Sequence, residues 1–81
     1  MELEDELLNR IVVNPKVMAG KPVIRGTRIL VELILKLLAQ GLSHDEILKD
    51  YPHLTIEDIK AALLYAAKVM GSEEIYPLIT E

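Results

Sequence analysis

The sequence predicts a mostly α-helical domain, in which three helices form a helix-turn-helix-like bundle preceded by a short β arm. Three observations carry this prediction. The chain has no Phe and no Trp, so its core must be aliphatic, and the many Leu and Ala residues favour helices. From about residue 31 the apolar residues recur at helical spacing. Capping residues and glycines then divide that region into three segments.

The first helix is predicted to begin near Val31 and to stop at Gly41. Its apolar residues follow i, i+3, i+4 and i+7 spacing: Val31, Ile34, Leu35, Leu38 and Leu42. Other leucines occupy its remaining sides, so the helix is apolar nearly all round. Such a helix packs centrally or gives one face to a partner.

The second helix is predicted over residues 44–50. Ser43 followed by Glu46 fits a capping box, and Pro52 disfavours helix at the residue before it. A turn of about four residues then leads into the third helix, which makes the pair helix-turn-helix-like. A simple three-helix bundle without any role in DNA binding gives the same pattern and stays open at this point.

The third helix is predicted over residues 56–70. Thr55 followed by Asp58 repeats the capping pattern with a shorter acid, and Gly71 ends the helix. The side expected to face inward carries Ile56, Ile59, Leu63, Ala66, Ala67 and Met70.

An irregular arm with short strands is predicted over residues 10–29. Residues 11–13 are β-branched, and Asn-Pro at 14–15 is a turn signal. Residues 23–24 and 28–30 are further extended candidates. Three residues that disfavour helix lie in this region. Gly20 and Pro22 precede residues 23–24, and Gly26 separates them from residues 28–30. Because strands this short are unstable as an isolated hairpin, we expect them to pair with another chain or to lie on the helices.

The 81 residues are enough for one domain, which we place at residues 10–71. An acidic segment, 1–9, precedes it and fits either a short helix or a frayed end. A tail, 72–81, follows it. The apolar runs are too short for a membrane span, and the acidic start is the reverse of a signal peptide. We therefore expect a soluble, cytoplasmic protein.

The net charge of −4 conceals a basic segment. Residues 1–15 carry four acids against one arginine, and residues 37–81 carry eight acids against three lysines. Residues 16–36 carry five basic residues against one acid. A compact basic segment of this kind can bind nucleic acid although the protein as a whole is acidic.

Four polar residues in the arm are the candidates for DNA binding: Lys21, Arg25, Thr27 and Arg28. They can meet phosphates or base edges, and Gly26 would allow the backbone to turn or approach closely. In the alternative, the arginines pair with acids of a neighbouring helix or subunit, while Gly26 and Thr27 only shape a turn.

The third helix is a poor reader of DNA, because Glu57 and Asp58 in its first turn repel phosphate. Its outer face carries an apolar stripe that is more typical of a protein contact. The protein-interface candidates combine this stripe with the tail: Ala61, Leu64, Tyr65, Lys68, Ile75, Tyr76 and Leu78. In the alternative, the tail folds back through Tyr76 and Leu78 and covers the stripe.

No residues suggest catalysis. The chain has no cysteine, and its two histidines, His44 and His53, are nine positions apart without a metal-binding pattern. Gly20-Lys21 lacks the spacing of a phosphate-binding loop, and Ser43 and Thr55 are explained as caps. We therefore expect no enzymatic activity, no metal and no cofactor.

The arm and the helices together resemble the domain of unknown function 433 family. The likeness rests on Asn14-Pro15 and on Gly-Lys-Pro-Val-Ile-Arg-Gly-Thr-Arg-Ile at 20–29, and it continues to about residue 67. It implies a homeodomain-like three-helix fold with a short β arm, and a prokaryotic origin. Members of the family are regarded as antitoxins similar to VapB-type proteins, paired with PIN-like nucleases.

The leading hypothesis is therefore an antitoxin-like homodimer that binds operator DNA and masks a PIN-like nuclease with a terminal segment. The second hypothesis is a homodimeric protein-protein interaction module that binds no DNA. A third is an enzyme subunit or a sensor of a small ligand. The dimer is expected because the short strands and the apolar helix faces need partners.

Overall fold

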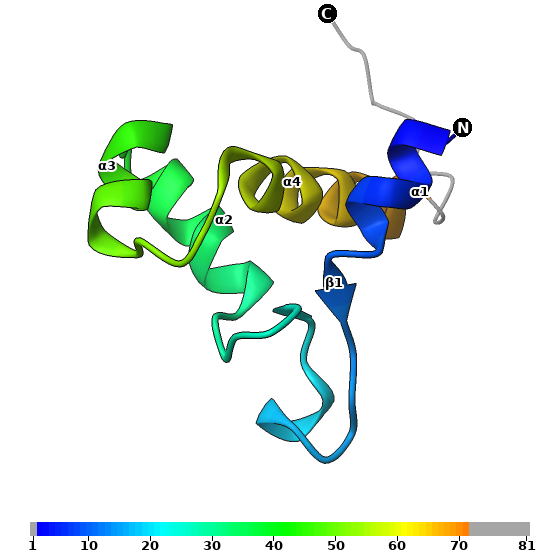
Figure 1. The fold of residues 1–81 in the computed structure, drawn as a ribbon. Coiled ribbons are helices and arrows are strands. Elements are labelled where there is room, and N and C mark those ends of the chain that lie inside the picture. The colour runs from blue at the N-terminus through cyan, green and yellow to red at the C-terminus, as the bar shows by residue number, and fades with distance from the viewer. Residues whose placement is uncertain (1, 72–81) are drawn as a thin grey trace, which may run out of the picture.

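The computed structural model describes residues 2–71, which form four α-helices and a two-stranded antiparallel sheet (Figure 1). The helices are α1 (Glu2–Leu8), α2 (Val31–Ala39), α3 (His44–Asp50) and α4 (Ile56–Gly71). The mostly helical class with a short β arm is confirmed. The helix count is four rather than three, because the acidic segment forms α1.

Helix α1 packs against α4, beside the half of α4 that leads to Gly71 (Figure 1). A salt bridge of 3.1 Å joins Glu4 Oε1 to Lys68 Nζ across the two helices. The acidic segment is therefore part of the helical assembly.

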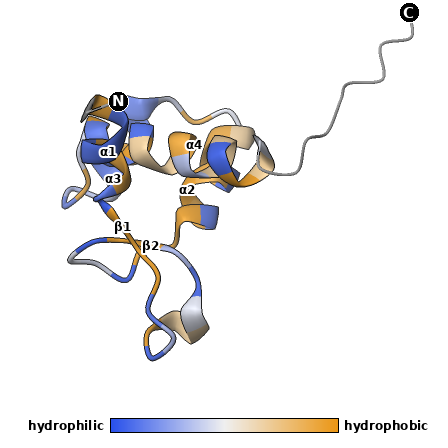
Figure 2. Cartoon of the chain, turned by 90° about the vertical axis from the view of Figure 1, so that its right-hand side faces the viewer, coloured by the Kyte–Doolittle hydropathy of each residue, from blue (hydrophilic) through white to orange (hydrophobic). Residues whose placement is uncertain are grey.

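The arm's two strands pair with each other within the chain. Strand β1 (Ile11–Val12) runs antiparallel to β2 (Val23–Ile24), with Ile11 opposite Ile24 and Val12 opposite Val23. A 3-10 turn (Met18–Gly20) lies between them. Both residues of β2 are buried, and both strands are apolar (Figure 2). The strands thus need no second chain for their pairing, which corrects one argument for a dimer.

The core lies where α2, α3 and α4 meet β2. Each of these helices contributes one fully buried isoleucine, namely Ile34, Ile47 and Ile59, and β2 adds Ile24. At roughly 25 cal/mol per Å² of apolar surface, these four side chains contribute much of the hydrophobic stabilisation of so small a domain. They also hold the arm against the bundle.

Helix α2 ends in a Schellman motif. Gly41 has φ +95°, a left-handed conformation that glycine adopts without strain. The Gly41 N–H donates to the Leu38 carbonyl at 3.0 Å, and the Leu42 N–H donates to the Leu37 carbonyl at 3.1 Å. The stop predicted at Gly41 is confirmed.

Helix α3 occupies the predicted residues 44–50 and begins with the predicted capping box. The Ser43 N–H donates to Glu46 Oε1 at 2.7 Å, and the Glu46 N–H donates to Ser43 Oγ at 3.1 Å. This helix is too short to be stable alone, so its cap and the burial of Ile47 hold it in place.

Helix α4 begins with the same reciprocal pattern. The Thr55 N–H donates to Asp58 Oδ2 at 2.9 Å, and the Asp58 N–H donates to Thr55 Oγ1 at 3.2 Å. A five-residue connection from α3, residues 51–55, leads into this cap.

The inner and outer sides of α4 differ in part from the prediction. Ala61, expected on the outer face, is fully buried, whereas Leu63 and Met70, expected inside, are exposed. Ala61 and Lys68 share one side of the helix at i and i+7, and Lys68 binds Glu4 of α1. Helix α1 thus binds, through Lys68, a side of α4 that was predicted to contact another protein.

Candidate functional site

The basic turn, residues 24–28, is closed by its own hydrogen bonds. The Thr27 N–H donates to the Ile24 carbonyl at 3.0 Å, and Thr27 Oγ1 donates to the same oxygen at 2.7 Å. The Ile29 N–H in turn donates to Thr27 Oγ1 at 3.0 Å. Gly26 has φ +81°, which suits the third position of a type II turn. Gly26 and Thr27 therefore shape the turn, as the alternative from the sequence proposed.

The two arginines of the basic turn are exposed. Arg25 Nε donates to the Asn9 carbonyl at 2.7 Å, which ties the turn to the end of α1 rather than to an acid. Within residues 2–71 the Arg28 guanidinium makes no hydrogen bond or ion pair. Arg28 is thus the cation of this turn that is available to an external anion.

Lys21 is held apart from the basic turn. Its Nζ lies 3.3 Å from Glu32 Oε1, and Glu32 also binds Lys36 at 3.6 Å. One acid on α2 therefore partly neutralises two lysines. The four residues predicted to bind DNA do not form one cluster, because only Arg25, Thr27 and Arg28 lie together.

A histidine that the sequence did not connect to the arm completes the basic site. An open hollow of about 540 Å³ is lined by Arg25, Gly26, Thr27, Arg28, Ile29 and His53. His53 comes from the connection between α3 and α4. Nothing in the sequence signals this contact, because the two segments are far apart along the chain. The basic turn therefore lies beside the turn of the helix-turn-helix-like pair.

The acidic start of α4 is less repulsive to phosphate than predicted. Asp58 is buried, and its Oδ1 accepts a hydrogen bond from Arg10 Nη1 at 3.1 Å. Its charge is therefore compensated inside the fold. Glu57 remains exposed as an acid of this first turn.

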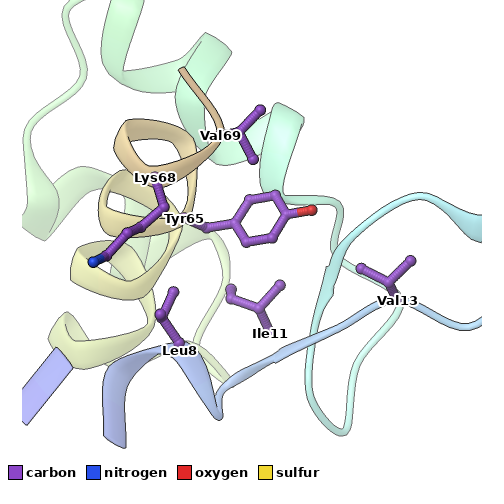
Figure 3. A pocket seen from close by; sticks show the side chains of 6 residues that line it. All are labelled: Leu8, Ile11, Val13, Tyr65, Lys68 and Val69. Carbon is purple, nitrogen blue, oxygen red and sulfur yellow. The ribbon is translucent and has the colours of Figure 1, made fainter. Parts of the chain in front are cut away.

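A second surface, here called the apolar groove, lies between the arm, α1, α2 and the last turns of α4. It consists of two adjoining hollows of about 500 and 210 Å³ that share Tyr65 and Val69. The first is also lined by Leu8, Ile11, Val13 and Lys68, and the second by Pro22, Val31, Glu32, Leu35, Ala66 and Met70. Figure 3 shows the Tyr65 ring extending from α4 towards the arm, with the Lys68 amine pointing away from it.

The residues predicted for protein contact are divided by the structure. Tyr65 and Lys68 line the apolar groove, Leu64 is half-buried, and Ala61 is buried. Ile75, Tyr76 and Leu78 lie outside the described residues.

Within residues 2–71, no three His, Asp or Glu side chains are grouped so that they could hold a metal ion. In the same residues every buried side-chain nitrogen and oxygen has a hydrogen-bond partner. None of the described helices is long and apolar enough to cross a membrane.

These features define a small helical domain with a two-stranded arm, a basic turn and an apolar groove. The chain belongs to the family described as "Protein of unknown function (DUF433)", whose model matches residues 11–66. This confirms the resemblance found in the sequence. The basic turn and the capping residues lie inside the matched region, whereas α1 and the end of α4 lie outside it.

The chain is similar to an uncharacterised bacterial protein and to a solved structure. The chain is 38% identical over 53 residues to "Uncharacterized protein y4eO" of Sinorhizobium fredii (strain NBRC 101917 / NGR234). That match covers 65% of this chain but 24% of the relative, so the chain spans about a quarter of the relative's length. A crystal structure of a DUF433 member protein from Anabaena variabilis superposes with a TM-score of 0.72 at 35% identity, covering 90% of this chain and 79% of that one.

Proposed function

We propose that this chain is a DNA- and protein-binding module of a prokaryotic toxin–antitoxin pair and has no enzymatic activity of its own. The observation that carries the DNA-binding part is the basic turn, where Arg25 and Arg28 are exposed on a backbone fixed by hydrogen bonds. His53 lines the same hollow. The order of α2, α3 and α4, with a five-residue connection between α3 and α4, supports the proposal.

The basic turn, rather than α4, makes the DNA contact in this proposal. The guanidinium of Arg28 can form paired hydrogen bonds to a phosphate or to a guanine edge without giving up a partner within residues 2–71. Helix α4 instead begins with the exposed acid Glu57 and carries Tyr65 and Val69 into the apolar groove. Its surface therefore suits a protein better than a nucleic acid.

The test is the binding of the DNA upstream of the protein's own gene, measured by fluorescence anisotropy at several salt concentrations. Arg28→Ala is expected to weaken binding and to reduce the slope of log K against log [salt] by about 1 if Arg28 meets a phosphate. Arg28 is a better probe than Arg25, because Arg25→Ala also removes the bond to Asn9.

Lys60→Ala is the matched control, because it removes one exposed positive charge from α4 instead of the arm. We expect it to leave the affinity nearly unchanged. If Lys60→Ala weakens binding more than Arg28→Ala does, α4 is the DNA reader and the proposed mode of contact is wrong. If wild-type protein shows no salt-dependent binding to this DNA, the DNA-binding part of the proposal is wrong.

The protein partner in this proposal is a PIN-like nuclease, masked by a homodimer of this chain. Support comes from the family resemblance and from the apolar groove, which offers Tyr65 and other apolar side chains to a partner. Co-expression with the product of the neighbouring gene is the test. Stoichiometric co-purification with loss of nuclease activity is expected, and an uninhibited nuclease would contradict the proposal.

A homodimeric interaction module without DNA binding is the second candidate, and the apolar groove favours it. Because the arm's strands pair within one chain, this dimer rests on the groove and not on strand exchange. Light scattering over a range of concentrations tests it. A monomer at every concentration would exclude this module and also the homodimer in the antitoxin proposal.

A further inference from the structure

One face of α4 is buried in its first half and only partly covered in its second, where Tyr65 and Ala66 are half-buried. Ile59 and Ala62 are completely buried. Tyr65, Ala66 and Val69 continue that face at i+3 and i+4 spacing, yet they line the apolar groove. Val69 is 46% exposed in the described structure. The core-forming face of α4 thus extends beyond the elements that cover it in residues 2–71.

The opposite wall of the groove is apolar as well. Ile11 and Val13 of the arm face Tyr65 across the first hollow (Figure 3), and Pro22 and Leu35 line the second. Val13 is 53% exposed. The groove therefore offers apolar side chains from both walls to a segment or molecule that can fill it.

We infer that the segment Ile75–Ile79 of the same chain occupies the apolar groove. Gly71, the last described residue, directly follows Val69 and Met70, which line the groove. The next apolar run along the chain is Ile-Tyr-Pro-Leu-Ile at 75–79. An apolar segment of this kind is what is needed to cover the apolar groove. This inference is independent of DNA binding.

The length of the chain fits a return along α4. The four steps from Gly71 to Ile75 can span at most about 14 Å. Tyr65 lies about 9 Å back from Gly71 along the helix axis, at 1.5 Å per residue. Residues 72–74 therefore suffice to reverse direction, and five extended residues then cover about 17 Å, which is more than the roughly 9 Å between Gly71 and Tyr65.

The composition of the tail fits the same arrangement. Pro77 disfavours helix at Tyr76, so the run reads as an extended segment rather than as a continuation of α4. The acids Glu73 and Glu74 precede the apolar run, so residues 75–79 themselves carry no charge. A helix C-terminus does not itself attract acids, so the apolar contact carries the binding.

The test compares two substitutions on α4 in the full chain. The measured quantity is the rate of amide hydrogen exchange of residues 75–79, observed by NMR. Val69→Glu places a charge in the groove, whereas Leu63→Glu places the same charge at a site of equal exposure outside it, 44% against 46%. We expect Val69→Glu to accelerate exchange of residues 75, 76, 78 and 79 by about tenfold or more. Leu63→Glu is expected to leave it unchanged.

A reciprocal pair of substitutions keeps the test decisive if Val69→Glu fails to fold. Leu78→Glu is expected to shift the methyl signals of Val13 and Val69, whereas Thr80→Glu in the same tail is not. Both effects are expected to persist unchanged on serial dilution. The inference would be overturned if Val69→Glu folds and leaves the amide exchange of residues 75–79 unchanged. It would also be overturned if Leu78→Glu leaves the methyl signals of Val13 and Val69 unshifted. Effects that vanish on dilution would assign the groove to a second copy.

Discussion

Asp58 connects the arm to the bundle through a single carboxylate. One of its oxygens caps α4 by accepting from the Thr55 N–H, and the other accepts from Arg10 in the arm. A buried acid is costly unless its oxygens are satisfied, and here both are. The residue therefore contributes to local helix formation and to the position of the arm at once.

Replacing Asp58 by Ala is expected to lower the free energy of unfolding by about 2 kcal/mol. Roughly half comes from the lost cap and the rest from the ion pair, discounted because the Arg10 side chain is 42% exposed. Urea unfolding measures the loss. Asp45→Ala, an exposed acid in the first turn of α3, is the control, with an expected cost of about 0.5 kcal/mol. Equal losses in the two variants would show that Asp58 acts only through the helix dipole.

Gly26 is expected to matter for its backbone conformation and not for the space around it. A Cβ at Gly26 would meet no atom within 4 Å, but the φ of +81° is unfavourable for an L-residue. Gly26→Ala should therefore cost about 1 kcal/mol in thermal unfolding. Gly71→Ala, where φ is not positive and space is also open, should be neutral or slightly stabilising. A neutral Gly26→Ala would contradict the rigid turn proposed for DNA contact.

Among the elements, α3 depends most on a few residues. It has one buried side chain, Ile47, and its cap supplies the other main stabilisation. The sequence was sufficient to place this helix, because Ser43 and Glu46 act within a single turn. The same holds for the start of α4 and for the end of α2, where the signals are also local.

Ile47→Ala is expected to destabilise the domain by about 3 kcal/mol, because the completely buried side chain leaves a cavity between α3 and the core. Leu48→Ala, on the half-buried neighbour, should cost clearly less. Chemical denaturation ranks the two. If Leu48→Ala costs as much as Ile47→Ala, α3 is anchored by a different face from the one described.

The features that the sequence missed all depend on contacts between distant segments. Helix α1 packs on α4, and the acidic segment carries no signal for that contact. His53 joins the basic turn because the fold brings the α3–α4 connection beside the arm. The pairing of β1 with β2 needs the core residue Ile24 as its support. Local rules of capping and periodicity contain none of this information.

At the scale of the whole molecule, the basic segment is divided into a free part and a neutralised part. Arg28 has no partner for its guanidinium within residues 2–71, whereas Lys21 and Lys36 share Glu32. Exposed ion pairs of this kind contribute little to stability, roughly 0 to 1 kcal/mol. The main effect of Glu32 is therefore to lower the positive electrostatic potential around Lys21 and Lys36.

Glu32→Gln should strengthen DNA binding by releasing Lys21 to the phosphates, while stability changes by less than about 0.5 kcal/mol. The slope of log K against log [salt] should become steeper, by up to about 1 for one added phosphate contact. Glu57→Gln makes the same change in net charge at the start of α4. If net charge alone governed binding, the two variants would gain equally. A larger gain for Glu32→Gln locates the DNA along the arm, whereas a larger gain for Glu57→Gln locates it along α4, against the proposed mode.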